Sequence, residues 1–370
     1  MLKVVIDARM INNSGIGTYL QNMIPSLKDN FKLILLGKKI VLEAFEWSKD
    51  IEMIETVSDI YSIKEQFELP FKIPACDIFI SPHYNIPLLP LRVKKRVVVI
   101  HDVYHLVFYK TLSLAQKTYA KFMISKAVNL SDKIITISEF SRSEILKNTN
   151  AKSEKIEIVY FGRDASNFIK NQSDENFDIV KNRYNLPDKY FLFVSNIKPH
   201  KNLKNLILAF EILLKQNKEF KLVVAGKGEG LITVDSDVRV LIDTKEELKK
   251  NIIFTGYIKN TDMPAIYKNA FALVFPSFYE GFGLPPLEAM MCDCPVISSN
   301  TASLPEACGD AALYIDPFNI ADITEKMQFL IAKPELRGEL IKKGQKNYKK
   351  FNQDSFSEKL CQVITNTVKE

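Results

Sequence analysis

Short apolar runs alternate with longer segments of helical spacing along the chain. In the first half, the apolar runs predict strands at 3–6, 32–36, 78–81, 96–100, 133–137 and 155–159. Apolar residues at helical spacing predict helices between them, for example at 19–27 and 114–129. Strands that alternate with helices in this way favour a parallel sheet covered by helices on both faces.

The alternation stops in the polar stretch 170–178 and then starts again. The second series predicts strands at 191–194, 221–225, 252–255, 272–275, 295–298 and 312–314. A chain of 370 residues is long enough for two α/β domains, and we expect them at 1–168 and 186–350. The last segment, 351–370, predicts a helix, and its packing back on the N-terminal domain is left open.

The composition is that of a soluble globular protein, with 46% hydrophobic and 25% charged residues. No apolar run approaches the roughly 20 residues that a membrane-spanning helix needs. The N-terminal run MLKVVIDARM predicts a buried strand instead of a cleavable signal peptide. The five cysteines form no CxxC pair, which favours free thiols in a reducing compartment. We therefore expect a cytoplasmic protein.

The net charge of +6 is concentrated in the first half of the chain. The segment 103–131 has no acidic residue but contains Lys110, Lys117, Lys121 and Lys126. A basic and partly apolar helix can lie on an anionic bilayer, here on the inner face of the membrane. A core-packed helix with a solvated lysine face fits equally well, so both interpretations stay open. Nucleic acid is not an expected partner, because the chain has neither a binding motif for it nor a strongly basic domain.

The most informative stretch is FPSFYEGFGLPPLEAMMCDCP, at 275–295. A strand runs into a turn that contains Gly281 and Gly283, and a helix is predicted from about Pro285. Glycines let the backbone approach a ligand, and the free amides of a helix start bind anions. Glu280 and Glu288 flank this turn and can accept hydroxyl hydrogens on either side of a phosphate. The alternative is a pair of surface glutamates around a helix cap.

These residues resemble glycosyltransferase family 4, whose members are retaining enzymes with the GT-B fold. The resemblance rests on Glu280-x7-Glu288 within GFGLPPLEAM, on FTGYIKNTDMPAIYKNA upstream and on CPVISSNTASLPEACGDAALYIDP downstream. It implies two Rossmann-like domains that face each other across a deep cleft and bind a nucleotide sugar. In this region the resemblance implies donor-binding roles for Gly256, Tyr257, Glu280, Gly281, Phe282, Gly283, Leu284 and Glu288, with Glu280 also catalytic.

A second motif follows the predicted strand YFLFV and reads SNIKPHKN. It resembles the family loop that neutralises the donor diphosphate, and Lys201 matches the catalytic lysine of that loop. Ser195, Asn196 and His200 are then expected to bind the donor as well. Many family members have arginine at the positions of Asn196 and His200, so Lys201 is the main cation here.

Two features of the first domain resemble parts of the same family site. Gly15 and Gly17 belong to a GIG-x-Y turn whose amides approach the donor. His101 ends a predicted parallel strand, where α/β proteins bind ligands. In the family, this histidine contacts the donor sugar near the reaction centre, so we expect a catalytic role. A structural histidine bonded to the backbone is the alternative.

No metal ion or other cofactor is expected. Asp235-Ser236-Asp237 matches the Asp-x-Asp pattern that holds a metal in another glycosyltransferase fold. It lies away from the other motifs, and the resemblance implies that protein cations and amides bind the diphosphate. We interpret this match as accidental.

The sequence therefore predicts a retaining glycosyltransferase that transfers a hexose from a nucleotide sugar. The resemblance is greatest to bacterial mannosyltransferases, so GDP-mannose is the leading donor, and UDP-linked sugars stay open. A glycan or polyprenyl-linked glycan in surface polysaccharide synthesis is the expected acceptor. A GT-B-fold nucleotide-sugar 2-epimerase and a non-enzymatic two-domain sugar-binding protein are the alternatives.

Overall fold

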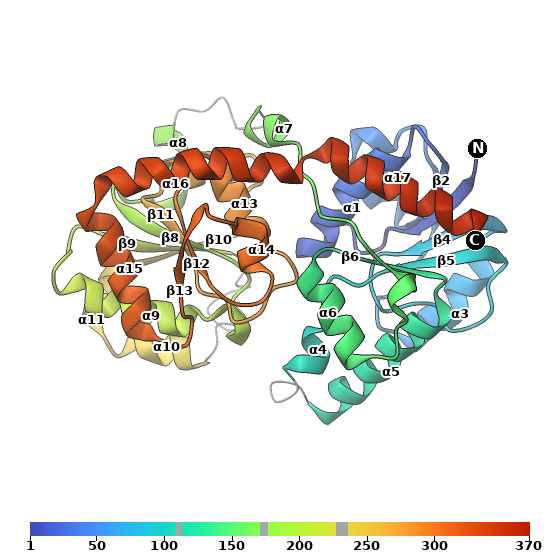
Figure 1. Cartoon of the computed structure of the whole chain (residues 1–370), viewed down its shortest axis with the longest axis horizontal. Coiled ribbons are helices and arrows are strands. Elements are labelled where there is room, and N and C mark those ends of the chain that lie inside the picture. The colour runs from blue at the N-terminus through green and yellow to red at the C-terminus, as the bar shows by residue number, and fades with distance from the viewer. Residues whose placement is uncertain (109–112, 171–176, 227–235) are drawn as a thin grey trace. The chain divides into compact units, whose positions relative to one another are not determined.

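The computed structural model describes residues 1–108, 113–170, 177–226 and 236–370, and its chain divides into two compact units (Figure 1). Unit 1 consists of Met1–Arg163 and Phe351–Glu370, and unit 2 of Asp164–Lys350. Asp235 of the Asp-x-Asp match and Lys110 of the basic segment lie outside the described residues.

Unit 1 contains a seven-stranded sheet in the order β3-β2-β1-β4-β5-β6-β7, in which every strand pair is parallel. The sequence pattern missed β3, whose Glu52 and Glu55 interrupt the apolar character expected of a buried strand. It lies at the sheet edge, where such residues are tolerated. The strands are β1 (Lys3–Asp7), β2 (Lys32–Gly37), β3 (Glu52–Glu55), β4 (Cys76–Ser81), β5 (Val93–Val99), β6 (Lys133–Thr136) and β7 (Ile156–Ile158).

The helices of unit 1 include one from the end of the chain. They are α1 (Ser14–Leu27), α2 (Lys39–Leu42), α3 (Ile63–Lys72), α4 (Tyr104–Val107), α5 (Leu114–Leu130), α6 (Glu139–Asn148) and α17 (Gln353–Lys369). Helix α17 lies along α1 (Figure 1), where Phe356 packs edge-on against Tyr19. At its start, the Gln353 amide donates to Ser26 Oγ at 2.7 Å.

Helices α3 and α5 cover the same face of this sheet. Leu69 of α3 packs in one core cluster with Phe79 of β4, and Met123 of α5 packs in another with Val98 of β5. The register pairs Phe79 with Arg96, and side chains alternate along a strand, so Phe79 and Val98 point to one side. The outer sides of α3 and α5 are therefore presented on the same side of unit 1.

Unit 2 contains a six-stranded sheet in the order β10-β9-β8-β11-β12-β13, again with all pairs parallel. Its strands are β8 (Tyr190–Val194), β9 (Lys221–Ala225), β10 (Ile252–Gly256), β11 (Ala272–Phe275), β12 (Val296–Ser299) and β13 (Ala312–Ile315). Its helices are α7 (Ala165–Lys170), α8 (Phe177–Tyr184), α9 (Leu203–Leu214), α10 (Ser236–Asp243), α11 (Glu246–Asn251), α12 (Met263–Asn269), α13 (Leu284–Met291), α14 (Leu304–Cys308), α15 (Ile320–Ala332) and α16 (Pro334–Asn347).

The strand order of unit 2 reverses between β8 and β11. The chain runs outward from β8 through β9 to β10, then returns to β11 on the other side of β8. Loops that leave adjacent parallel strands in opposite directions open a crevice at their carboxyl ends, where α/β proteins bind ligands. The loops after β8 and β11 are those that carry Lys201 and Glu280. Unit 1 has the same reversal, between β1 and β4.

A buried ionic network ties the end of β1 to α3. The Arg9 guanidinium makes two bonds to the Asp7 carboxylate, at 2.9 and 2.8 Å, and contacts Glu65 Oε2 at 2.7 Å. The side chains of Arg9 and Asp7 are each 6% exposed, and that of Glu65 is 1% exposed. Removing the cation would leave two buried carboxylates without a counter-charge.

We expect Arg9→Met to lower the free energy of unfolding of unit 1 by about 3–5 kcal/mol, the usual cost of breaking a buried ion pair. The only tryptophan of the chain, Trp47, lies in unit 1, so its fluorescence during urea unfolding reports on this unit. Arg142→Met, which removes a surface pair with Glu139, is the control and should change little. An unchanged midpoint for Arg9→Met would show that the network does not hold α3.

Candidate functional site

The loop after β8 begins in close contact with the loop after β9. The Ser195 amide donates to the carbonyl of Ala225 at 3.0 Å. A Cβ atom on Gly226 would lie 1.9 Å from the carbonyl oxygen of Ser195, so only glycine fits there. This contact fixes where the segment Ser195-Asn196 leaves the sheet.

Asn202 joins the loop after β8 to the loop after β11. Its backbone is left-handed, with φ of 60°, and its side chain is buried. The side-chain amide donates to the carbonyls of Pro276 at 3.0 Å and Pro317 at 2.8 Å. The Phe278 amide adds a bond to the carbonyl of His200 at 2.8 Å. The residues just before Asn202 are thereby held against the second loop.

This arrangement brings Lys201 and Glu280 together. The Lys201 ammonium lies 2.7 Å from each carboxylate oxygen of Glu280. The two side chains are only 18% and 12% exposed, so water screens the pair less than it would on an open surface. An ammonium has three N–H groups, and this pairing directs two of them at Glu280.

The turn at Glu280–Gly283 is shaped by a buried serine and a glycine. The hydroxyl of Ser303, which is fully buried, lies 2.9 Å from the carbonyl oxygen of Glu280 and 2.8 Å from that of Phe282. Gly283 has φ of +128°, and a Cβ there would lie 2.9 Å from a methyl of Leu304. Helix α13 starts at Leu284 without a side-chain cap. Pro285 and Pro286 have no N–H group, so the Leu284 amide is the one that the first three residues of α13 can offer to an anion.

Glu288 lies one turn into α13 and is held by a neighbouring helix. The hydroxyl of Tyr267, from α12, donates to Glu288 Oε2 at 3.0 Å. Burial, together with the charge of Glu288, raises the pKa of the Tyr267 phenol well above its ordinary value. Tyr267 thus stays protonated and fixes the direction of a partly exposed carboxylate.

Gly256 and Tyr257 lie further from the Lys201–Glu280 pair. Gly256 ends β10 and Tyr257 follows it; β10 is the edge strand and is separated from β11 by β9 and β8. Gly256 has φ of +69°, and the Tyr257 side chain is 59% exposed. The carbonyl of Gly256 accepts a bond from the Gly226 amide at 3.2 Å, which connects this end to the loop after β9.

In unit 1, Gly15 and Gly17 lie in the first turn of α1. A Cβ on Gly17 would lie 2.5 Å from the carbonyl oxygen of Ile11, so this position requires glycine for packing. Nothing lies within 4 Å of a Cβ built on Gly15, which is exposed. Gly15 therefore leaves the backbone of the turn open to a ligand, and Gly17 shapes it.

His101 follows β5 and is a neutral imidazole. Its Nε2 lies 3.0 Å from the carbonyl oxygen of Pro82, which can only accept, so Nε2 carries a proton. Burial lowers the pKa of His101, and the charge of Asp102 offsets only part of this. Nδ1 is then an acceptor. The ring packs edge-on against Tyr19 at 4.9 Å.

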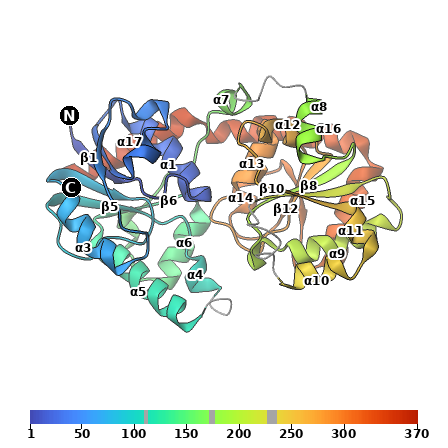
Figure 2. The same cartoon turned by 180° about the vertical axis from the view of Figure 1, so that it is seen from behind.

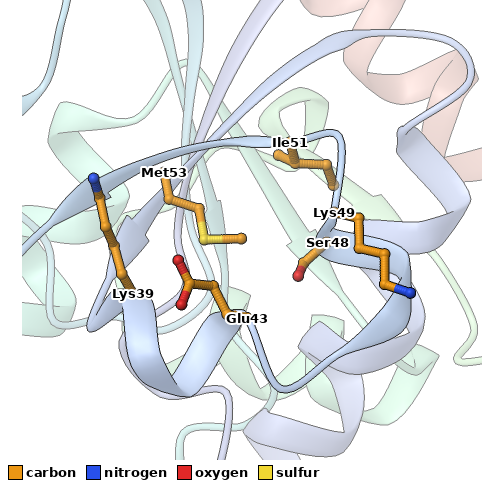
Figure 3. Close-up of a pocket in the computed structure, with 6 residues that line it drawn as sticks. All are labelled: Lys39, Glu43, Ser48, Lys49, Ile51 and Met53. Atoms are coloured by element: carbon orange, nitrogen blue, oxygen red, sulfur yellow. The ribbon is translucent and has the colours of Figure 1, made fainter.

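Two surface hollows lie in unit 1. The one shown in Figure 3 measures about 400 Å³ and is lined by Lys39, Glu43, Ser48, Lys49, Ile51 and Met53. It contains none of the predicted site residues. A smaller one, of about 190 Å³, lies at the carboxyl ends of β1, β2 and β3 and is lined in part by Arg9, Asn12 and Lys38. The predicted residues Gly15, Gly17 and His101 do not line either hollow.

Two features are absent from the residues that the structure describes. No three histidine, cysteine, aspartate or glutamate side chains are grouped so that they could hold a metal ion within those ranges. Within the same ranges, no helix combines the length and the apolar character needed to cross a bilayer.

Sequence reasoning did not find the residues that position this site. Three residues contact a predicted residue or its loop: Asn202, Tyr267 and Ser303. In each case the two partners are more than 20 residues apart in the sequence. Tyr267 and Ser303 lie within the runs that carry the family resemblance, and Asn202 directly follows Lys201. Their place in or beside those motifs is the one sequence signal for these residues, and it does not indicate which residue each of them contacts.

Comparisons with known proteins show the fold of the chain and a family match within unit 2. The two parallel-sheet units have the GT-B fold: a solved structure of Anabaena Alr3699/HepE in complex with UDP-glucose superposes with a TM-score of 0.79, at 15% identity, and covers 99% of this chain and 100% of that one. Residues 174–347 match the family model described as "Glycosyl transferases group 1". The match lies within unit 2.

Two curated relatives are named as mannosyltransferases. O-antigen chain mannosyltransferase B of Escherichia coli is 31% identical over 238 residues, which cover 64% of this chain and 61% of the relative. O-antigen chain mannosyltransferase RfbU of Salmonella typhimurium is 30% identical over 237 residues, with coverages of 64% and 60%. The chain thus spans about three fifths of the length of the curated relatives it matches.

We expect the ring of His83 to stay neutral as the pH falls from 8 to 6, and the ring of His101 to protonate only below the ordinary histidine pKa. Burial lowers the pKa of His83 to about 3, with smaller contributions from the neighbouring His101 and His105 rings, and burial lowers the pKa of His101. Ring nitrogen shifts in NMR spectra would check this. In the unfolded chain these rings take up protons at about pH 6.5, whereas in the folded chain they do so only at lower pH. Their contribution to stability is therefore present above about pH 6.5 and is lost as the pH falls below it. A titration of either ring near 6.5 would contradict the assignment.

Proposed function

We propose that this protein is a retaining glycosyltransferase that transfers a hexose from a nucleotide sugar to a glycan acceptor. The observation that carries the proposal is the Lys201–Glu280 pair beside the uncapped start of α13. Both lie at the strand reversal of a unit that matches a glycosyltransferase family. The names of the curated relatives support the same class.

The proposed role of Lys201 is to stabilise the leaving diphosphate. Breaking the bond between sugar and phosphate builds negative charge on the phosphate oxygens. A fixed ammonium and the Leu284 amide at the start of α13 meet this charge without reorganising, which is the usual main source of such catalysis. Glu280 holds Lys201 in place, and we propose that it also binds sugar hydroxyls when the donor enters.

The proposed donor is GDP-mannose. The relatives named as O-antigen chain mannosyltransferases support the sugar, and UDP-linked donors are the alternative because a structural neighbour was solved with UDP-glucose. Glu288, held by Tyr267, is proposed to accept the ribose hydroxyls of the nucleoside. Ser195, Asn196, His200, Gly256, Tyr257 and the turn at 281–284 complete the proposed donor site, with no metal ion required.

For the acceptor, we propose a glycan or polyprenyl-linked glycan of surface polysaccharide synthesis. A polyprenyl-linked glycan is presented at a membrane surface, so this acceptor requires peripheral contact with a bilayer. We further propose a front-side reaction in which the leaving phosphate takes the acceptor proton, since this route retains the anomeric configuration. The neutral His101, with Nδ1 as an acceptor, is suited to bind a sugar hydroxyl, and Gly15 leaves an open backbone for the donor.

A donor screen followed by product analysis tests the proposal. We expect GDP-mannose or a UDP-sugar to raise the melting temperature of the full chain, and free sugar to have no effect. Transfer should increase the mass of a glycan acceptor by one hexose, and NMR of fresh product should show the donor's anomeric configuration. Interconversion of nucleotide sugars without transfer would identify an epimerase. Tight binding of free sugar alone would identify a sugar-binding protein.

We expect Lys201→Ala to lower kcat by about 100-fold or more, the usual effect of removing one such electrostatic partner. Donor affinity should fall much less, because charge on the diphosphate grows mainly in the transition state. Lys204→Ala, which removes an exposed lysine paired with Asp237, is the matched control. Near-normal turnover of Lys201→Ala would show that the leaving group is stabilised elsewhere.

We expect Glu288→Gln to weaken the binding of both the nucleoside diphosphate and the whole donor by roughly tenfold, since a hydrogen bond to a charged group contributes about 1.5–3 kcal/mol. Calorimetric titration with each ligand measures this. Glu325→Gln, at an exposed position of α15, is the control. If binding of the donor became weaker while binding of the nucleoside diphosphate stayed unchanged, Glu288 would contact the sugar instead of the ribose.

A further inference from the structure

Helix α3 has a second apolar stripe on its outer side. Ile63, Phe67 and Phe71 follow one another at intervals of four residues, so they share one side of the helix. Their side chains are 82%, 57% and 85% exposed. The core side of the same helix is formed by other residues, with Leu69 buried against the sheet. Large apolar side chains that are grouped and exposed in this way indicate an interaction surface.

The acidic side chains of α3 are turned away from this stripe. Glu65 is buried against Arg9. The Glu68 carboxylate, which is 11% exposed, accepts bonds from the amides of Val57 and Ser58 at 2.9 and 2.7 Å. Lys64 is exposed beside the stripe. The outer side of α3 therefore presents apolar and cationic groups but no exposed carboxylate.

Helix α5, on the same face of the sheet, also presents exposed apolar and cationic side chains. Asn85 links the two helices, since its amide donates to Glu65 at 2.7 Å and its oxygen accepts from the Tyr119 hydroxyl at 2.5 Å. Helix α5 exposes Leu114 and Phe122, which are 79% and 48% exposed. Lys121 and Lys126 are exposed as well, and the helix has no acidic residue. Figure 2 shows α3 and α5 on the side of unit 1 away from α1.

We propose that α3 and α5 form a docking surface for an anionic membrane. The stripe of Ile63, Phe67 and Phe71 enters the boundary between headgroups and acyl chains. The lysines of α5 and Lys64 lie over the lipid phosphates. Interfacial helices combine these two contributions, apolar burial and attraction to anionic lipid.

The charge pattern favours a bilayer over a protein partner or a second copy of the chain. A second copy would place the lysines of this surface against identical lysines, and no carboxylate is exposed on α3 or α5 to pair with them. A bilayer of anionic lipids offers negative charge along the whole surface. A bilayer is also deformable, so it can accommodate apolar side chains that are spaced apart. A protein groove would need a matching pocket for each of them.

Vesicle co-sedimentation of the full chain tests the proposal without donor or acceptor, so its outcome is independent of the proposed transferase activity. The vesicles are phosphatidylcholine alone or with phosphatidylglycerol. We expect binding to the anionic vesicles, weaker binding at high salt and little binding to phosphatidylcholine. Phe67→Ser/Phe71→Ser should lower the partition coefficient roughly tenfold or more, since burying a phenylalanine contributes about 1.5–3 kcal/mol. Lys121→Gln/Lys126→Gln should reduce mainly the preference for anionic lipid.

Ile40→Ser is the matched control, because Ile40 is 81% exposed but lies on α2. It should bind vesicles like the unchanged protein. Trp47 fluorescence shows that each variant is folded. Failure of the unchanged protein to bind anionic vesicles would overturn the proposal, as would equal binding by the double phenylalanine variant. Self-association that the double variant abolishes, without vesicle binding, would assign the surface to a second copy.

Discussion

The contact between Lys201 and Glu280 is the interaction on which the interpretation of unit 2 depends. A lysine is a mobile side chain, and its ammonium becomes useful at a defined place only when a partner limits its motion. Here the partner is on the neighbouring loop, and both loops are bonded to each other through Asn202 and through the amide of Phe278. The reversal of strand order brings the loops side by side in the first place. The position of the charge thus follows from the topology of the sheet.

The architecture could be predicted largely from apolar periodicity, because buried parallel strands are nearly continuous apolar runs. The prediction of two parallel-sheet α/β units is confirmed. The sequence did not predict β3, and this has a physical reason. An edge strand pairs with one neighbour only and is less buried, so it tolerates Glu52 and Glu55, which remove the apolar signal. The strand bounds elsewhere differ by a few residues, as at β5, where Val93–Lys95 extend a strand whose apolar run starts later.

The residues of the candidate site could be predicted from sequence motifs, but the contacts between them could not. Lys201 and Glu280 are 79 residues apart, and no local pattern states that one will hold the other. The same applies to Tyr267, a buried aromatic whose hydroxyl reaches Glu288. Burial alone would suggest a packing residue, and only the folded chain shows the carboxylate that it orients. The roles of the individual residues in donor binding and turnover remain predictions.

The return of the chain to unit 1 has a consequence for synthesis. Unit 2 is formed by one continuous segment, whereas unit 1 needs α17, whose Phe356 packs against Tyr19 of α1. Domains fold as units while the chain emerges from the ribosome. Unit 2 can therefore complete its core first, and the early strands of unit 1 must wait for their last helix. During that interval the surface of unit 1 that α17 later covers is exposed to water.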